Sequence, residues 1–397
     1  MSSHVADAQA FIEEHWDPNG SMAAWHELVV DNGWAAPRWP VEWFGRGLSN
    51  DDAKEVEAVF AANDAPGPGH DRTNLWAGTL LGYGSDTLKG RFLRPLLMGE
   101  VAMCLLYSEP GAGSDLAGLR TTAVRDGDEY VVNGQKVWTS GARDADYGML
   151  IARTDWDVPK HRGITFFWFP MKQEGVEVRP LRQMTGDARF NEVFMNDARV
   201  SADNIVGGLN NGWGVLQAAL AYERAVMGRP GSRPREQSSE RVDKTAEAMG
   251  PIPAPDLSLV ALAQDLGKNT DPLVRQRLAR IHEMRKVTEW NGDRAKAELK
   301  MGGSSPLFSL GKLAMSGLLH EAGRVQGWLL GPEGALDGDQ HPRARDANYS
   351  QLNAYFTSIG GGTDQIQRNI IGERILGLPR EPEPDRDKNF RDVPANG

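Results

Sequence analysis

The apolar positions of this chain follow one pattern at both ends and another in the middle. From about residue 5 to 103 they recur at the spacing of an α-helix, as in the segment from Ala8 to Trp16. Between about 121 and 206 they alternate with polar positions, and the Asp126-Gly127 and Asn133-Gly134 pairs are typical of hairpin turns. After residue 210 the helical spacing returns. Helices are expected there over 257–266, 272–301, 307–330 and 348–376.

This order of patterns predicts an α+β protein with three domains. A helical N-terminal domain is expected over 1–103, an antiparallel β middle domain over 104–206 and a helical C-terminal domain over 207–397. Two segments lack apolar periodicity. We expect residues 229–255, rich in Gly, Pro, Ser and charge, to form a mobile surface loop. Residues 379–397 are expected to form a charged tail that frays, with contact to a neighbouring subunit as the alternative.

Composition narrows the class of protein. A hydrophobic content of 40% over 397 residues is typical of a globular protein with a sizeable core. The formal charge of −10 argues against nonspecific binding to nucleic acid or to acidic membranes. Cys104 is the single cysteine, so no intrachain disulfide forms, and no leader or apolar span of transmembrane length is found. We therefore expect a cytoplasmic protein without membrane insertion, and the eight histidines show no metal-ligand spacing.

Candidate chemistry is densest between Tyr107 and Gly141. The turn Ser108-Glu-Pro-Gly-Ala-Gly-Ser-Asp115 offers hydroxyl and backbone N–H groups to an anionic cofactor, and Trp138 follows beside two hydroxyl residues. A nicotinamide-binding Rossmann motif would need a glycine where Leu116 stands and a helix after the turn. The pattern favours a flavin site instead.

These motifs, with the late run from Gly362 to Arg368, resemble those of the acyl-CoA dehydrogenase family, and the resemblance extends over nearly the whole chain. It implies the fold of that family, with a helical N-terminal domain, an antiparallel β middle domain and a C-terminal four-helix bundle. It also implies FAD as cofactor. The residues that match cofactor-binding positions of the family are Ser108, Gly113, Ser114, Trp138, Thr139, Ser140, Gln276, Thr363 and Gln365.

By the same resemblance, Ser140 matches the hydroxyl that bonds near flavin N5, and Trp138 would cover the flavin ring. Ser114, Arg224 and Gly362 match substrate-binding positions, with Gly362 beside the thioester. Spacing alone would equally allow Trp138 to be an ordinary hairpin tryptophan.

Glu223 is the candidate general base. It continues the apolar stripe of Trp213, Leu216 and Leu220, and a carboxylate on such a stripe is desolvated, which raises its pKa. A buried Glu bonded by another helix is the alternative on spacing alone. The resemblance favours catalysis, because many members carry their base where Gly361 stands here, whereas the isovaleryl-CoA and long-chain branch carries it in a Glu-Arg pair that matches Glu223 and Arg224.

Together these matches imply dehydrogenation of an acyl-CoA thioester to a 2-enoyl-CoA, with electrons passed to an electron-transfer flavoprotein. A homo-oligomer, dimer or tetramer, is expected. Two departures bear on the cofactor site between subunits: the usual Arg-x-x-Phe-Gly segment is replaced near Asp265, and a Gly-rich segment is loosened to Leu330-Gly-Pro-Glu-Gly334. A hetero-oligomer therefore stays open, as do a flavin monooxygenase or oxidase on the same fold and a purely structural subunit of a complex.

Overall fold

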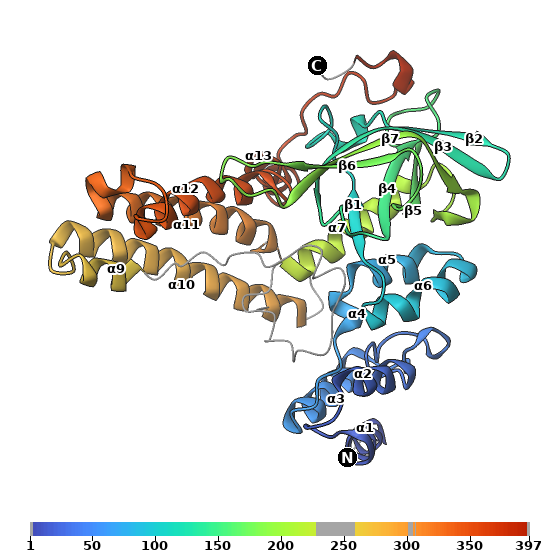
Figure 1. Ribbon diagram of the computed structural model, residues 1–397, viewed down its shortest axis with the longest axis horizontal. Coiled ribbons are helices and arrows are strands. Elements are labelled where there is room, and N and C mark those ends of the chain that lie inside the picture. The colour runs from blue at the N-terminus through green and yellow to red at the C-terminus, as the bar shows by residue number, and fades with distance from the viewer. Residues whose placement is uncertain (1–2, 228–258, 301–304, 306, 395–397) are drawn as a thin grey trace. The chain divides into compact units, whose positions relative to one another are not determined.

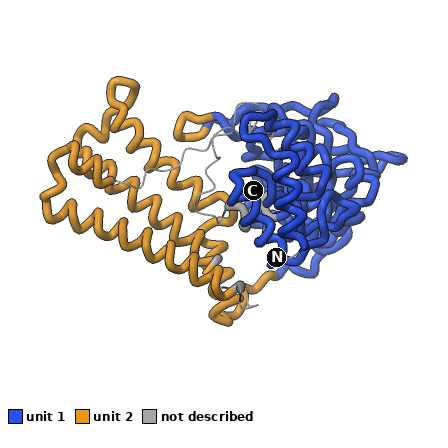
Figure 2. Tube along the Cα trace, turned by 90° about the horizontal axis from the view of Figure 1, so that it is seen from below, with its two compact units in different colours: residues 1–182, 188–251, 384–397 blue, residues 183–187, 252–383 orange. Residues whose placement is uncertain are grey.

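The computed structural model describes residues 3–227, 259–300, 305 and 307–394. The loop expected over 229–255 lies outside the described residues. The chain forms two compact units, coloured separately in Figure 2. Unit 1 comprises residues 1–182, 188–251 and 384–397, and unit 2 comprises 183–187 and 252–383. The three predicted domain ranges remain a prediction, and the tail is assigned to the same unit as the sheet.

Unit 1 begins with helices, as the periodicity predicts (Figure 1). They are α1 (Ser3–His15), α2 (Met22–Asp31), the short 3₁₀ helix η1 (Val41–Trp43), α3 (Asn50–Ala62), α4 (His70–Thr73), α5 (Leu75–Tyr83) and α6 (Asp86–Met98). Serine hydroxyls at Ser21, Ser49 and Ser85 cap α2, α3 and α6 by accepting a backbone N–H bond. Large aromatic residues, among them Trp34 and Phe60, fill the core between these helices.

A sheet of eight strands follows. The strands are β1 (Met103–Leu106), β2 (Thr122–Asp126), β3 (Glu129–Ser140), β4 (Tyr147–Arg153), β5 (Ile164–Pro170), β6 (Val176–Leu181), β7 (Phe190–Ser201) and β8 (Ile205–Val206). Their order is β6-β7-β3-β2-β4-β5-β8, with β1 beside β4. Most strand pairs are antiparallel, as expected. Strand β1, however, pairs with β4 in parallel, and so does Thr122 at the start of β2.

The two predicted hairpin turns have different outcomes. Asp126-Gly127 does join β2 to β3, with Gly127 at φ 62°. The Asn133-Gly134 turn was a wrong prediction, because both residues lie inside β3, where the register with β7 shifts. Glycine is needed there for space: a Cβ on Gly134 would lie 2.4 Å from the hydroxyl oxygen of Thr121.

Helix α7 (Gly212–Met227) completes the described core of unit 1. It packs against α4, α5 and β5, and its residues Val215, Leu216 and Ala219 are buried. The apolar stripe predicted from the spacing is therefore confirmed at Leu216. The helix extends through Glu223 and Arg224, whose side chains lie outside the described part of the structure.

Unit 2 is helical. Its helices are α9 (Leu259–Asp265), α10 (Pro272–Lys300), α11 (Leu307–Leu330), the 3₁₀ helix η4 (Gly331–Ala335), α12 (Pro342–Ile359), α13 (Asp364–Ile370) and the π-helix η5 (Ile371–Ile375). Leu259, Val274, Ile281, Leu318 and Val325 form part of its core. The single helix expected over 348–376 is wrong in its continuity: Gly361 at φ 65° and Gly362 at φ 91° separate α12 from α13.

The expectation that the C-terminal tail frays is wrong for residues 384–394. Residues 384–394 lie on unit 1, and the short helix η6 (Phe390–Asp392) buries Phe390 to 1% exposure. The backbone N–H groups of Phe390 and Arg391 donate to the carbonyls of Val158 and Trp156. An aromatic side chain within the charged segment supplies the apolar surface that holds it. No helix in the described part of the chain is long and apolar enough to cross a membrane.

Candidate functional site

The glycine-rich turn begins with a tight backbone loop. The N–H of Glu109 donates to the carbonyl of Ala112 at 3.0 Å, and the N–H of Ala112 donates back to Glu109 at 3.1 Å. Beyond this loop Gly113 and Ser114 are exposed, and Ser108 before it is half-buried. A Cβ at Gly113 would meet no atom within 4 Å. The turn therefore presents its hydroxyls and backbone at an accessible surface.

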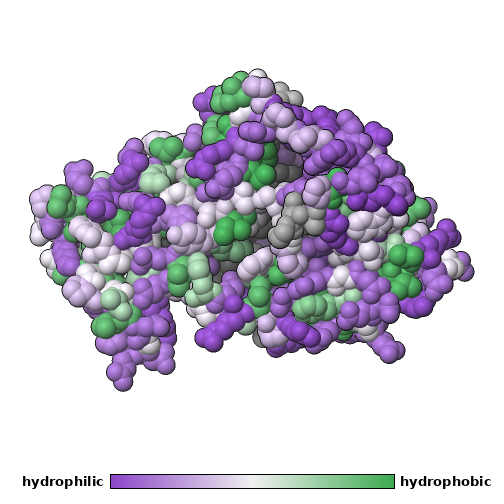
Figure 3. All heavy atoms as spheres, turned by 90° about the horizontal axis from the view of Figure 1, so that it is seen from above, coloured by the Kyte–Doolittle hydropathy of each residue, from purple (hydrophilic) through white to green (hydrophobic). Residues whose placement is uncertain are grey.

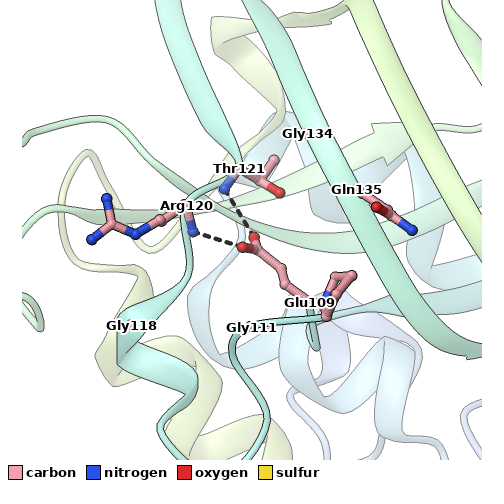
Figure 4. Close-up of a pocket in the computed structure, with 8 residues that line it drawn as sticks. Glu109, Gly111, Gly118, Arg120, Thr121, Gly134 and Gln135 are labelled. Atoms are coloured by element: carbon pink, nitrogen blue, oxygen red, sulfur yellow. Dashed lines mark hydrogen bonds between the residues drawn. The ribbon is translucent and has the colours of Figure 1, made fainter. Parts of the chain in front are cut away.

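A buried ion pair ties this turn to strand β3. Lys136 has no exposed surface, and its ammonium donates to Glu109 Oε1 at 2.8 Å and to the Tyr107 carbonyl at 3.0 Å. The backbone N–H of Thr121 donates to the same Oε1 at 2.9 Å, and the backbone N–H of Arg120 donates to Glu109 Oε2 at 2.7 Å, as the dashed lines in Figure 4 show. This carboxylate faces a small pocket of about 210 Å³.

The ionisation of Glu109 follows from these contacts. Burial would raise the pKa of its carboxyl, but the charge of Lys136 and the hydrogen bonds from Lys136, Thr121 and Arg120 outweigh burial and hold that pKa below its usual range. Glu109 is therefore a carboxylate at neutral pH. Burial lowers the pKa of Lys136, and the negative charge of Glu109 opposes that effect.

Trp138 lies at an irregularity of strand β3. The register with β7 shifts between Lys136 and Thr139, and Trp138 adopts φ 64°, which is rare for a bulky residue. Trp138 is 57% exposed, and its indole meets the Phe190 ring edge-on, at 5.8 Å between centroids. A large aromatic face held outward by a strained backbone is characteristic of a binding surface.

The neighbouring hydroxyl residues face different surroundings. Ser140 is half-buried, whereas Thr139 is 1% exposed and its hydroxyl has no hydrogen-bond partner in the structure. The carbonyl of Thr139 accepts a hydrogen bond from the Asn191 side-chain amide at 2.9 Å, so this residue is enclosed against strand β7. The N–H of Val137 donates to the carbonyl of Ser108 at 2.9 Å, so turn and strand lie side by side. The structure therefore brings together the predicted residues of unit 1: Ser108, Gly113, Ser114, Trp138, Thr139 and Ser140.

The predicted residues of unit 2 lie around the start of α13 and on α10. Thr363 caps α13 by accepting a bond from the Ile366 N–H at 3.1 Å, which leaves its hydroxyl proton free to donate to a ligand. Gly362 passes close to Gln367, since a Cβ there would lie 3.0 Å from its amide nitrogen. Gln276 and Gln365 are exposed.

Sequence reasoning missed the polar contacts that hold these elements. Asp364 accepts bonds from Ser316 at 2.8 Å and Lys312 at 3.3 Å, which join α13 to α11. In unit 1 it missed the Lys136–Glu109 pair. Each contact joins residues far apart in the chain, and the sequence contains no local signal for them.

Comparison with known proteins shows the family to which the chain belongs. A family model described as acyl-CoA dehydrogenase, middle domain, matches residues 104–198, and one described as acyl-CoA dehydrogenase, C-terminal domain, matches residues 238–376. The chain is 35% identical to acyl-CoA dehydrogenase IpdE1 of Mycobacterium tuberculosis, over 90% of this chain and 88% of that protein. It is 33% identical to the mitochondrial isovaleryl-CoA dehydrogenase of Pongo abelii, over 47% of this chain and 46% of that protein. The chain belongs to the acyl-CoA dehydrogenase family.

Solved structures of related chains share the fold. The ChsE4-ChsE5 complex from Mycobacterium tuberculosis matches with a TM-score of 0.64 and 29% identity, over 95% of this chain and 97% of that chain. A structure titled Tcur3481-Tcur3483 steroid ACAD matches with a TM-score of 0.68 and 25% identity, over 96% and 98%. The expected α+β fold of the family is confirmed, and the chain is an oxidoreductase of the acyl-CoA dehydrogenase type.

Proposed function

We propose that this chain binds FAD and dehydrogenates an acyl-CoA thioester at its α and β carbons, giving a 2-enoyl-CoA. The observation that carries the proposal is the exposed Trp138 indole, which a register shift in β3 turns outward beside the Ser108–Asp115 turn. A planar, largely apolar ring system with polar edges needs such a surface, with hydroxyl and backbone groups at its margin.

The residues of unit 1 fit a flavin. Trp138 would cover the ring and the Ser140 hydroxyl would bond near N5, while Thr139, 1% exposed between them and bonded to Asn191, would hold this part of the strand in place. Ser108 and Ser114 would line the ring from the turn. From unit 2 we assign Thr363, Gln365 and Gln276 to the rest of the cofactor, with the free hydroxyl proton of Thr363 as a donor.

In this mechanism Glu223 would be the general base that removes the α-proton of the thioester. In the sequence Glu223 comes four residues after Ala219, which is buried on α7, and continues the apolar stripe of that helix, on which a carboxylate is a stronger base than in water. Glu223 would take the α-proton of the thioester, and FAD, when bound, supplies the acceptor for the β-hydride. Arg224, Ser114 and a backbone N–H at Gly362 would position the thioester and its carbonyl.

The relatives suggest a substrate class and an assembly. One solved relative is titled Tcur3481-Tcur3483 steroid ACAD, and another is titled the ChsE4-ChsE5 complex. We infer that the acyl group is lipid- or steroid-derived and that electrons leave through an electron-transfer flavoprotein. The helices of unit 2 expose Trp290, Tyr355 and Ile359 to 64%, 51% and 63%. Exposed aromatic and apolar side chains of this kind favour an oligomer, with a second chain of different sequence as one candidate partner. Scattered green areas of hydrophobic residues are also visible on the face of the molecule drawn in Figure 3.

The test is anaerobic titration of the purified, FAD-reconstituted protein with acyl-CoA thioesters of several lengths and of steroid type. Loss of the flavin absorbance with at least one thioester supports the proposal. Fast reaction of the reduced protein with oxygen would indicate an oxidase or monooxygenase instead. A protein that takes up no FAD, alone or with a partner chain, would be a structural subunit, and the proposal would be wrong.

A further inference from the structure

The C-terminal tail covers a buried arginine. Phe390 lies with its ring centre 3.7 Å from the guanidinium carbon of Arg153 and 5.0 Å from that of Arg120, and its ring is 5.3 Å from that of Trp156. Arg153 and Phe390 are 0% and 1% exposed. Aromatic faces attract a guanidinium most strongly when both are removed from water. Within the described part of the structure, the Phe390 ring of the tail is therefore the aromatic ring that covers the buried guanidinium of Arg153.

Arg153 holds the segment that directly follows the glycine-rich turn. Its guanidinium donates to the carbonyls of Ala117 at 2.6 Å, Leu119 at 3.3 Å and Lys160 at 2.6 Å. Ala117 belongs to the 3₁₀ helix η2 (Leu116–Gly118), which directly follows the turn. Burial lowers the pKa of Arg153 to about 10, so it remains charged at neutral pH. Water admitted by loss of the tail would compete for this guanidinium and release the carbonyls of Ala117 and Leu119, which directly follow the turn.

Two further contacts connect the tail to the same turn. The guanidinium of Arg120 donates to the tail carbonyl of Val393 at 3.0 Å, while its backbone N–H donates to Glu109. The loop that accepts the tail's backbone bonds also carries Lys160, whose ammonium lies 3.0 Å from Asp115 Oδ1, at the end of the turn. The tail thus meets the turn through Arg153, Arg120 and the Lys160 loop.

We propose that Phe390 is a positioning residue for the cofactor: its docking on Arg153 holds residues 108–120 in the shape that binds FAD. This rests on the proposed function, because it takes that turn to be part of the FAD site. A tail that leaves the surface would loosen the turn without removing any group that contacts the cofactor. The defect should then be one of affinity and should disappear when FAD is in excess.

The experiment compares Phe390→Ala, Phe390→Leu and a control, Lys388→Ala, in the full-length protein. Lys388 is exposed and pairs only locally, with Asp385. Hydrogen exchange of the apoprotein is followed at 388–393 and at 109–121, and FAD binding is measured by titration. In Phe390→Ala we expect faster exchange in both segments, an FAD dissociation constant raised about fivefold or more, and a parental rate of flavin reduction at saturating FAD. Phe390→Leu keeps the apolar cover without the ring, so its effect should be intermediate.

Parental values for Lys388→Ala together with these changes support the proposal. Faster exchange at 388–393 with unchanged exchange at 109–121 and unchanged FAD affinity would overturn it, since the tail would then add stability alone. If Phe390→Ala does not fold, Phe390→Leu takes the same test. A parental protein that binds no FAD, while Phe390→Ala still loosens 109–121, would defeat the proposed function and leave the coupling of tail and turn supported.

Discussion

Lys136 Nζ lies 2.8 Å from Glu109 Oε1, and the two residues join the strand that carries Trp138 to the turn that carries Ser114. Lys136 is 0% exposed at its side chain and Glu109 9%. A pair so deeply buried gains little over an apolar pair of the same shape, but each member is costly without the other. Its main effect is therefore to fix the relative position of the two segments.

Lys136→Met should lower the free energy of unfolding by about 3 kcal/mol, because Glu109 is left as a buried charge without its partner. Adding Glu109→Gln to that variant should recover a substantial part of the loss. Urea unfolding of the four proteins in this double-mutant cycle measures the coupling. Single and double variants of equal stability would show that the two charges do not depend on each other.

The same pair makes stability depend on pH. The folded-state pKa of Glu109 lies below its usual 4.5, so its contribution is fully present above that value and is lost as the pH falls through the folded-state pKa. The difference in unfolding free energy between the parental protein and Glu109→Gln should be constant from about pH 7 to 5 and shrink below about 4. A difference that grows on acidification would contradict the assigned charge of Glu109.

Thr139 and Ser140 provide a matched pair for the cofactor site. Ser140→Ala should weaken FAD binding or slow flavin reduction by about tenfold, since a lost hydrogen bond near N5 removes roughly 1–2 kcal/mol. Thr139→Val should leave both unchanged and stabilise the fold slightly, because the Thr139 hydroxyl is buried without a partner. Flavin titration and thermal unfolding measure the two effects. The reverse result, with Thr139→Val impairing FAD binding, would remove Ser140 from the ring edge.

Periodicity was sufficient to predict where the chain is helical, though not the break at Gly361, and it predicted the buried face of α7 at Leu216, because burial there follows from spacing alone. It failed at Gly134, where glycine allows close approach to Thr121 instead of forming a turn. It also failed at Phe390, whose burial depends on Arg153, more than 200 residues away in the chain. Contacts of that kind depend on the tertiary fold, which composition and spacing do not encode locally.

In the candidate site, too, some features could be predicted from the sequence and others depend on the tertiary fold. The motif Trp138-Thr139-Ser140 could be recognised from the sequence, but the outward indole and the inward threonine could not, because they depend on a register shift between β3 and β7. Gly361 is a related case. At φ 65° it adopts a conformation that disfavours a side chain, so a carboxylate placed there by Gly361→Glu would cost about 1 kcal/mol in backbone strain.

Glu223→Gln is the decisive variant for the proposed chemistry. Glutamine keeps the shape and polarity of the side chain but cannot accept the α-proton, so FAD and acyl-CoA should bind as before while flavin reduction falls at least about 100-fold. Stopped-flow absorbance under anaerobic conditions, with the best thioester from the panel, measures that rate. Glu289→Gln, on the exposed side of α10, serves as control and should reduce its flavin at the parental rate. If Glu223→Gln also reduces its flavin at the parental rate, another group takes the proton and the assignment of Glu223 is wrong. If it fails to bind acyl-CoA, Glu223 is a binding residue, and the base must be sought elsewhere.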